Sequence, residues 1–405
     1  MSILRSTLLL TLTNLAVRTG SYAFRIIMAR MLTLYEFGIL NLALPLQFFI
    51  VILSSAGIAP SIAKFVAEGK EKAVSSALFY FTLIALGFSV LTALLSPVIA
   101  VNIFHDRNVA IPLAIASLAL PFAAAIAVLT GAMQGKKKMA SFASSLLILQ
   151  GGRIVFATIL VLFFATAGYA VAGSVMGFAF ALITAFWLFR GTEIKITKPD
   201  FSSFKEVFNF SLPVSITSIA AFALAYLDIL MLGAFLSPKE VGIYSVASPT
   251  SRLVLAFSSA IYATILPRIS GLRGDKTKIR KVVAYSTRIS FVVLFITTVI
   301  FIIISKPIIL LLFGSRYSQA VNPFRILLFG TFFFGMYTLN SGVFQGMGMP
   351  KIPMKILVVS AVLDLILNLA LIPNYGIIGA AIASSTSMIL AGLSSVLLLH
   401  RYMKD

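Results

Sequence analysis

Two arginines, Arg18 and Arg25, stand inside an apolar run near the N-terminus, where a charged side chain is costly. Seven residues are nearly two helical turns, so both side chains point the same way, about 10 Å apart along the axis. Asn14, Ser21 and Tyr22 fall on or near the same side. Polar residues of this kind usually face a bundle interior or a wet cavity and mark a substrate or ion path. A stripe that only bonds to a neighbouring helix is the structural alternative.

The charged residues inside the apolar runs are mostly basic. The basic residues inside such runs are Arg18, Arg25, Arg153, Arg252, Arg288 and Arg325. Only two acids, Asp228 and Asp364, share that environment, which leaves a surplus of positive charge. Arg288 and Arg325 lie within two turns of a run's end and can extend to the membrane interface instead. Arg153 and Arg252 lie deeper in their runs, so the interface is harder for them to reach.

The elements that must position these residues are membrane-spanning helices. Apolar residues make up 60% of the chain and charged residues 11%, and the mean hydropathy is +1.05. A spanning helix needs about 20 mostly apolar residues. The sequence therefore predicts an all-α polytopic membrane protein with about twelve spanning helices. The predicted runs are 6–29, 40–63, 75–101, 109–131, 142–164, 168–189, 207–235, 243–266, 282–304, 322–345, 356–373 and 377–399.

The loops between the apolar runs are alternately rich and poor in Lys and Arg. If the N-terminus is inside, 21 Lys and Arg lie on that side, among them Lys136 to Lys138, Arg268 and Arg273, whereas the opposite loops hold five. This asymmetry predicts cytoplasmic termini and an even number of helices. It also explains the positive loops by topology, without a nucleic-acid partner.

Residues for catalysis are scarce. The sequence has no cysteine, and His105 and His400 lie in unrelated loops without an evident acid and nucleophile. There is no phosphate-binding G-K-[ST] loop and no H-E-x-x-H pair. The first run is too long and too charged for a cleavable signal peptide. We therefore expect a transporter and not an enzyme.

The two halves of the chain resemble each other. MLTLYEFGIL at 31–40 matches FLSPKEVGIY at 235–244, with Glu36 and Glu240 aligned, and G-x-x-Q-G recurs at 131–135 and 342–346. Six helices per half give parallel repeats in one orientation. The polar join at 190–205 predicts an N-lobe of residues 1–195 and a C-lobe of 196–405. Ser203 and Glu206 have capping-box spacing at the start of the second half.

Several segments together resemble the oligosaccharide/polysaccharide flippase family, which belongs to the multidrug/oligosaccharidyl-lipid/polysaccharide exporter superfamily. They are EFGIL, VGIYSVASP, TILPRISGL, GVFQGMGMPK and LNLALIPNYGIIGAAIAS, in this order at helix ends. The resemblance covers residues 5 to 400. It implies a V-shaped pair of six-helix lobes that work by alternating access. It also implies a plasma-membrane flippase for isoprenoid-pyrophosphate-linked oligosaccharides.

The charged residues agree with this resemblance, because arginine makes bidentate contacts with phosphate. Arg18, Arg25, Arg153 and Arg252, with Asn14 and Tyr22, are predicted to line a cavity between the lobes and hold the pyrophosphate. The partners implied are the lipid-linked oligosaccharide and membrane lipids. Glycan-assembly enzymes would act with the protein in a pathway, without a stable complex.

A coupling cation is the one cofactor that the resemblance suggests. Some relatives in the superfamily hold Na⁺ in the second lobe, and the residues here that fit are Asp228, Asp364, Asn368 and Ser384. Two carboxylates with amide and hydroxyl oxygens suit a hard cation. Two alternatives stay open: each aspartate neutralises an arginine, Arg252 or Arg288, or one carboxyl carries a coupling proton.

Two other functions in the superfamily compete with this prediction. A cation-coupled multidrug antiporter would use an acid in the first lobe, where the runs here contain only arginines. A peptidoglycan-precursor flippase would usually have fourteen helices instead of twelve. The sugar, the polyprenol and the oligomeric state are not identified by the sequence.

Overall fold

The structure is a computed structural model that describes residues 3–404 apart from 56, 257–264, 266–268, 270 and 273–275. Two of the basic residues assigned to the cytoplasmic side, Arg268 and Arg273, lie outside the described residues. The chain divides into two compact units, Met1–Ile219 and Ala220–Asp405. The division falls within a helix, later than the predicted join at 195. The described residues contain helices and turns and no strand.

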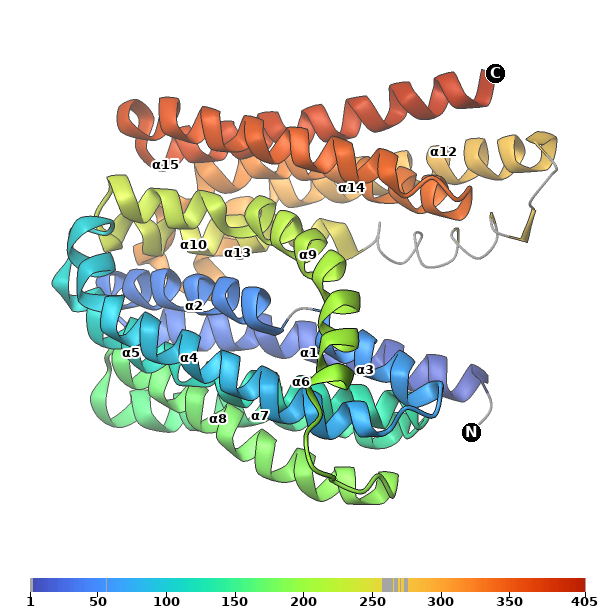
Figure 1. Ribbon diagram of the computed structural model, residues 1–405. Helices are drawn as coiled ribbons and strands as arrows, with labels where there is room; N and C mark the ends of the chain where they lie inside the picture. The colour runs from blue at the N-terminus through green and yellow to red at the C-terminus, as the bar shows by residue number, and fades with distance from the viewer. Residues whose placement is uncertain are drawn as a thin grey trace. The chain divides into compact units, whose positions relative to one another are not determined.

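Unit 1 consists of helices that run back and forth beside one another (Figure 1). Its elements are α1 (Ile3–Met31), α2 (Leu34–Ser55), α3 (Ile58–Ala67), α4 (Lys72–Asn102), η1 (Arg107–Val109), α5 (Ala110–Ser117), α6 (Ala119–Gly135), α7 (Met139–Phe164), α8 (Ala167–Phe189), η2 (Arg190–Thr192) and the first part of α9 (Phe201–Phe235). One buried cluster joins α3, α4, α6, α8 and the start of α9, and includes Ile62, Phe81, Val128 and Val207.

Unit 2 has the rest of α9 and the helices that follow it. They are α10 (Pro238–Ser251), η3 (Arg252–Val254), α12 (Lys276–Ile303), α13 (Ser305–Phe313), η4 (Ser315–Ala320), α14 (Val321–Gly346) and α15 (Lys351–Lys404). The long α15 contains a break at Gly376, where φ is 56° and ψ is −135°. This break lies between the predicted runs 356–373 and 377–399, so α15 holds both of them.

The prediction of an all-helical multi-pass membrane protein is confirmed. Eight helices in the described part are long and apolar enough to cross a membrane, and two shorter apolar helices add to them. The predicted run 40–63 is wrong as a single element, because α2 and α3 are separated at Gly57, whose φ is 81°. Hydropathy does not reveal such a break, because both sides of it are apolar.

Glycines allow α7 and α8 to pack backbone to backbone. A Cβ atom on Gly173 would lie 2.3 Å from the Ala157 Cα, and one on Gly177 would lie 2.5 Å from the Arg153 backbone nitrogen. Both distances are too short for any side chain. The four-residue spacing is the small-residue pattern of membrane helix pairs. It brings Arg153 on α7 against α8.

The segment before α9 is tied to unit 1. Ser75 and Ser76 on α4 accept hydrogen bonds from the backbone nitrogens of Thr197 and Asp200, at 2.9 and 2.8 Å. The Asp200 carboxylate in turn accepts from the Ser203 nitrogen at 2.8 Å and caps α9. The expected capping box of Ser203 and Glu206 is therefore wrong, because α9 begins earlier and Glu206 pairs with Lys70 at 2.7 Å.

Candidate functional site

The predicted polar face of α1 lies in unit 1. Asn14 and Arg18 are exposed, and Tyr22 and Arg25 are half-buried. All four lie on one continuous helix, since α1 runs unbroken from Ile3 to Met31. The spacing inferred from the sequence therefore holds in three dimensions: Arg18 and Arg25 project to the same side of α1.

Arg25 is held in place by an amide on the next helix. Its Nη1 donates a hydrogen bond of 3.0 Å to Oδ1 of Asn41 on α2. The Asn41 Nδ2 donates to the carbonyl of Phe37 at 2.7 Å, which leaves Oδ1 as the acceptor that faces the guanidinium. Asn41 is 6% exposed, so the amide is a fixed part of unit 1. Asn41 is a neutral acceptor, so this contact orients the guanidinium without placing a negative charge beside it.

The same face of α1 reaches α7. Ser21 donates a hydrogen bond of 3.2 Å to Oε1 of Gln150. At Gly20 the two helices are close enough that a Cβ would lie 2.9 Å from the Gln150 side chain. The polar residues of α1 thus continue into a polar position on α7.

Arg153, one turn further along α7, has a more enclosed setting. Its Nε donates to Oγ of Ser174 on α8 at 2.9 Å. Its guanidinium carbon lies 5.4 to 5.6 Å from the ring centres of Phe24, Phe48 and Phe178. Three aromatic faces around one cation contribute to packing as well as to charge stabilisation. Arg153 therefore joins α1, α2, α7 and α8.

Sequence reasoning missed the uncharged polar residues of this region. Asn41, Gln47 and Gln150 all lie inside apolar helices and are buried or nearly so. Neither amide atom of Gln47 has a hydrogen-bond partner among the described residues. A buried amide without a partner is costly, so Gln47 is a candidate functional residue that charge alone does not reveal. A search for amides within apolar runs, added to the search for charges, would have found these residues.

In unit 2, Asp228 is the centre of a hydrogen-bonded group. Its Oδ2 accepts from the Tyr244 hydroxyl at 2.8 Å and from the Ser248 hydroxyl at 3.1 Å. Arg252 lies at the edge of this group, with Nη2 at 4.0 Å from the carboxylate and 3.1 Å from Ser248 Oγ. Asp228 is 2% exposed. The ion pair is thus looser than the two hydroxyl contacts.

Asp364 on α15 belongs to the same region. Its carboxyl group interacts with the carboxylate of Asp228 and lies beside the side chains of Ser384 and Asn368. Oδ1 of Asp364 and Oδ1 of Asn368 have no hydrogen-bond donor in the described part of the chain. Both residues are buried, at 3% and 0% exposure. Two unpartnered buried oxygens beside a hydroxyl are a donor set that fits a small hard cation.

The structure thus brings together the four residues predicted for a cation. In the described residues, no cluster of three or more His, Cys, Asp or Glu side chains exists. What the described residues show is two aspartates near each other, with one amide and one hydroxyl beside Asp364.

The amino-acid sequence of the chain matches models of known protein families. A sequence model of the family described as "Polysaccharide biosynthesis protein" matches residues 3–273, and a model described as "MatE" matches residues 213–370. "Uncharacterized membrane protein MJ1375" of Methanocaldococcus jannaschii is 28% identical over 99% of this chain and 100% of its own length. "Probable low-salt glycan biosynthesis flippase Agl15" of Haloferax volcanii is 27% identical over 51% of this chain and 44% of its own length.

Solved structures share the fold. "Lipid II flippase MurJ, inward closed conformation" superimposes with a TM-score of 0.83, at 18% identity over 97% of this chain and 87% of that protein. An inward-facing multidrug resistance transporter of the MATE family gives a TM-score of 0.81, at 14% identity over 96% of this chain and 94% of that protein. At such identities the likeness establishes the architecture alone.

Proposed function

Because the chain belongs to the polysaccharide biosynthesis protein family, we propose that it is a flippase for isoprenoid-pyrophosphate-linked oligosaccharides. It would carry the sugar head group from the cytoplasmic to the outer leaflet by alternating access, while the lipid tail stays in the bilayer. Relatives named as a glycan biosynthesis flippase and as a "Putative O-antigen transporter" of Shigella flexneri support this substrate class. Both termini would be cytoplasmic, in the plasma membrane, as the distribution of Lys and Arg indicates.

The polar face of α1 carries this proposal. Arg25 is oriented by a buried amide, and Arg18 is exposed on the same side of the helix. A pyrophosphate offers several anionic oxygens to two guanidinium groups, each of which can donate two hydrogen bonds. The apolar runs of the first half contain no acid that would compete for these groups. Arg18 and Arg25 would therefore bind the pyrophosphate, with Asn14 and Tyr22 beside them.

The other two arginines would have supporting roles. Arg153 donates to Ser174 and is surrounded by three phenylalanine rings, so it would fix α7 and α8 behind the α1 face. Arg252 lies 4.0 Å from Asp228, so its charge is partly balanced within unit 2. That all four arginines face one cavity stays a prediction.

The Asp228 and Asp364 group would couple transport to a cation. We propose Na⁺ held by Asp228, Asp364, Asn368 and Ser384, because the unpartnered oxygens of Asp364 and Asn368 require a positive partner or a proton. When bound, the ion would neutralise the carboxylate pair. A proton on Asp364 is the competing account, and the Arg252 contact to Asp228 is the third. Glycan-assembly enzymes would supply the substrate without forming a stable complex.

A cation-coupled multidrug antiporter is the second candidate. The "MatE" match and the 28% identity to "Probable multidrug resistance protein NorM" over 47% of the chain favour it. An organic cation, however, would meet Arg18 and Arg25 on α1, where like charges repel.

The test is flipping by the purified protein in proteoliposomes. Arg25→Ala should lower the rate by about 10- to 100-fold, because a hydrogen bond to a charged group contributes about 1.5–3 kcal/mol. Arg25→Lys should recover part of the rate, since the charge remains without the bidentate geometry. Arg190→Ala, at an exposed arginine of η2, is the matched control and should behave as the unmodified protein. Normal flipping by a folded Arg25→Ala protein would remove the pyrophosphate role.

A further inference from the structure

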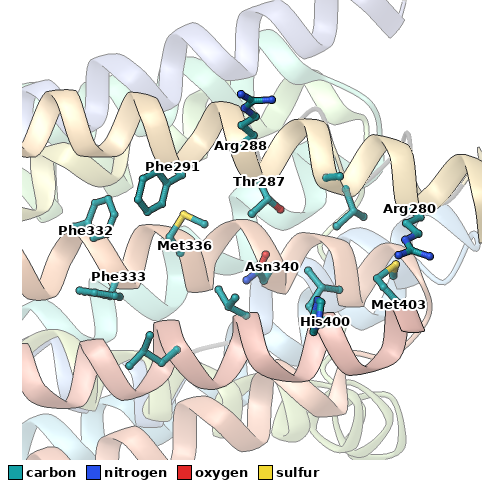
Figure 2. Close-up of a pocket in the computed structure, with 15 residues that line it drawn as sticks. Arg280, Thr287, Arg288, Phe291, Phe332, Phe333, Met336, Asn340, His400 and Met403 are labelled. Carbon is teal, nitrogen blue, oxygen red and sulfur yellow. The ribbon is translucent and has the colours of Figure 1, made fainter. Parts of the chain in front are cut away.

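A groove of about 560 Å³ lies within unit 2, between α12, α14 and the second part of α15. Figure 2 shows how the labelled side chains are ordered along it. Phe291, Phe332 and Phe333 gather at one end, Thr287, Met336 and Asn340 lie in the middle, and Arg280, His400 and Met403 lie at the other end. The volume is within the range of small-molecule sites.

The two ends differ in chemistry. Phe291, Leu393 and Val396 are large apolar side chains that line the groove and remain exposed. Arg280 and His400 are exposed at the opposite end, with Lys281 and Arg401 next to them in the sequence. From Arg280 to Phe291 is about 16 Å along the helix. The groove is therefore amphipathic along its length.

The basic end has no anionic partner within the part of the protein that the structure describes. None of the ion pairs or hydrogen bonds there involves Arg280 or His400. The sequences of α12 and α14 contain no acid, and α15 contains only Asp364, which belongs to the Asp228 group. Arg288 borders the groove, but its guanidinium points away from Asn340 (Figure 2). Arg280 and His400 are thus available to an anionic ligand.

Asn340 supplies an independent indication of a ligand. Its side chain is fully buried, lines the groove, and has an Oδ1 without a donor in the described residues. The amide orientation is fixed by Ser395, whose hydroxyl donates to Gly392 at 2.7 Å and so must accept from Asn340 Nδ2 at 3.0 Å. A buried acceptor of this kind needs a hydrogen-bond donor. Because Asn340 lines the groove, a ligand bound there is a candidate to supply that donor.

We propose that this groove binds a single-chain glycerophosphate lipid of the membrane. Such a lipid has a phosphate, then a free hydroxyl, then an acyl chain, which is the order of Arg280 and His400, Asn340, and the phenylalanine cluster. The phosphate would accept from Arg280, the hydroxyl would donate to Asn340 Oδ1, and the chain would lie on Phe291 and Phe332. Basic grooves between membrane helices are typical sites for phosphate head groups. This site is separate from the pyrophosphate contacts proposed on α1.

The experiment measures binding to the purified full-length protein with three probes of equal chain length. Lysophosphatidic acid has phosphate and hydroxyl, an alkyl phosphate lacks the hydroxyl, and lysophosphatidylcholine lacks the net negative charge. We expect lysophosphatidic acid to bind about tenfold more tightly than either of the others. Equal affinity for all three would show that the groove accepts any detergent-like chain and would overturn the proposal.

Two variants assign the contacts. Arg280→Gln should remove the preference for lysophosphatidic acid over lysophosphatidylcholine, whereas Lys281→Gln, at the exposed neighbour that does not line the groove, should keep it. Asn340→Leu should remove the preference for lysophosphatidic acid over the alkyl phosphate. If this variant still binds the alkyl phosphate, the variant is folded.

A loss in Lys281→Gln as large as that in Arg280→Gln would reduce the effect to general surface charge and contradict the site. Displacement of lysophosphatidic acid by a polyprenyl-pyrophosphate sugar would also contradict it, because the groove would then belong to the transport path. Failure of flipping in the Arg25 variants leaves these binding outcomes unaffected.

Discussion

The α1 face of unit 1 and the Asp228 group of unit 2 show opposite charge in two repeats of similar sequence. In unit 1, Arg25 donates to the amide of Asn41. In unit 2, Asp228 accepts from Tyr244 and Ser248, and Arg252 lies farther away at 4.0 Å. The shortest printed side-chain contacts of both central groups are thus to uncharged polar groups. This difference underlies the proposal that one repeat binds an anion and the other a cation.

A second pair of residues shows how repeats diverge. Glu240 closes a capping box with Ser237 at the start of its own helix. Its counterpart Glu36 instead accepts from the Ala167 nitrogen at 2.6 Å, at the start of α8. The same carboxylate thus serves a local role in unit 2 and joins two helices in unit 1. Sequence correspondence between repeats predicts position, and the contacts must be determined from the structure.

Among the variants that test this difference between the two units, reversal of the charge on α1 should lower the flipping rate most. Arg25→Glu should lower flipping by more than about 100-fold, since it removes charge-assisted hydrogen bonds and adds repulsion from the pyrophosphate. Arg190→Glu changes an exposed arginine in the same unit and should be near normal. The measurement is the initial flipping rate in proteoliposomes. A rate unchanged by Arg25→Glu would mean that α1 does not contact an anion.

Neutralisation of the acids in unit 2 should have the next largest effect. Asp364→Asn and Asp228→Asn should abolish the extra thermal stability that Na⁺ gives over K⁺, because an ion that binds only the folded state stabilises it. Transport driven by a sodium gradient should fall about tenfold if one ligand contributes about 1.4 kcal/mol. Glu68→Gln, on the surface of unit 1, is the control. Indifference of the unmodified protein to Na⁺ across a pH series would instead favour pairing with Arg252.

Arg153→Gln should show whether Arg153 stabilises the packing of unit 1 or contacts the substrate. Loss of the contacts to three rings and to Ser174 should lower the free energy of unfolding by about 1–2 kcal/mol. Flipping per folded molecule should stay within about threefold, a difference below 1 kcal/mol. Thermal unfolding and flipping are measured on the same preparation. A folded Arg153→Gln protein as inactive as Arg25→Ala would move Arg153 into the substrate contacts.

The Lys70 and Glu206 pair should have the smallest effect. Both side chains are about half exposed, and solvent screens such pairs strongly. The hydrogen bond to Glu206 raises the pKa of Lys70, so the contribution that depends on the Lys70 charge is present below pH 10.5 and is lost as the pH rises above that. Lys70→Gln should leave the unfolding temperature unchanged between pH 6 and 9, at low and high salt. A clear drop would show that this contact, which joins the start of α9 to unit 1, matters more than exposed pairs usually do.

Much of the helical framework could be predicted, because membrane helices need long apolar runs. The break in α15 follows from Pro373 and Gly376 between two runs, and the α1 stripe follows from helical spacing. The break at Gly57 and the cap at Asp200 were missed, since both depend on local backbone geometry that hydropathy does not report.

In the candidate sites, the charged residues could be predicted from the sequence and their uncharged partners could not. Charges inside apolar runs identified Arg25, Asp228 and Asp364. The partners Asn41 and Tyr244 depend on how neighbouring helices are rotated, which a single sequence does not specify. Gln47 is uncharged and was passed over for that reason, although its burial without a partner is as informative as a charge.

The most direct test of the central claim is transport by the unmodified protein, reconstituted alone, with two substrates offered side by side. One is a polyprenyl-pyrophosphate oligosaccharide whose sugar is detected on the far side of the membrane, and the other is a fluorescent organic cation. The positive α1 face predicts movement of the lipid-linked sugar, competition by another polyprenyl pyrophosphate, and no movement of the cation. Movement of the cation without the lipid-linked sugar would contradict the account and identify the protein as a drug antiporter.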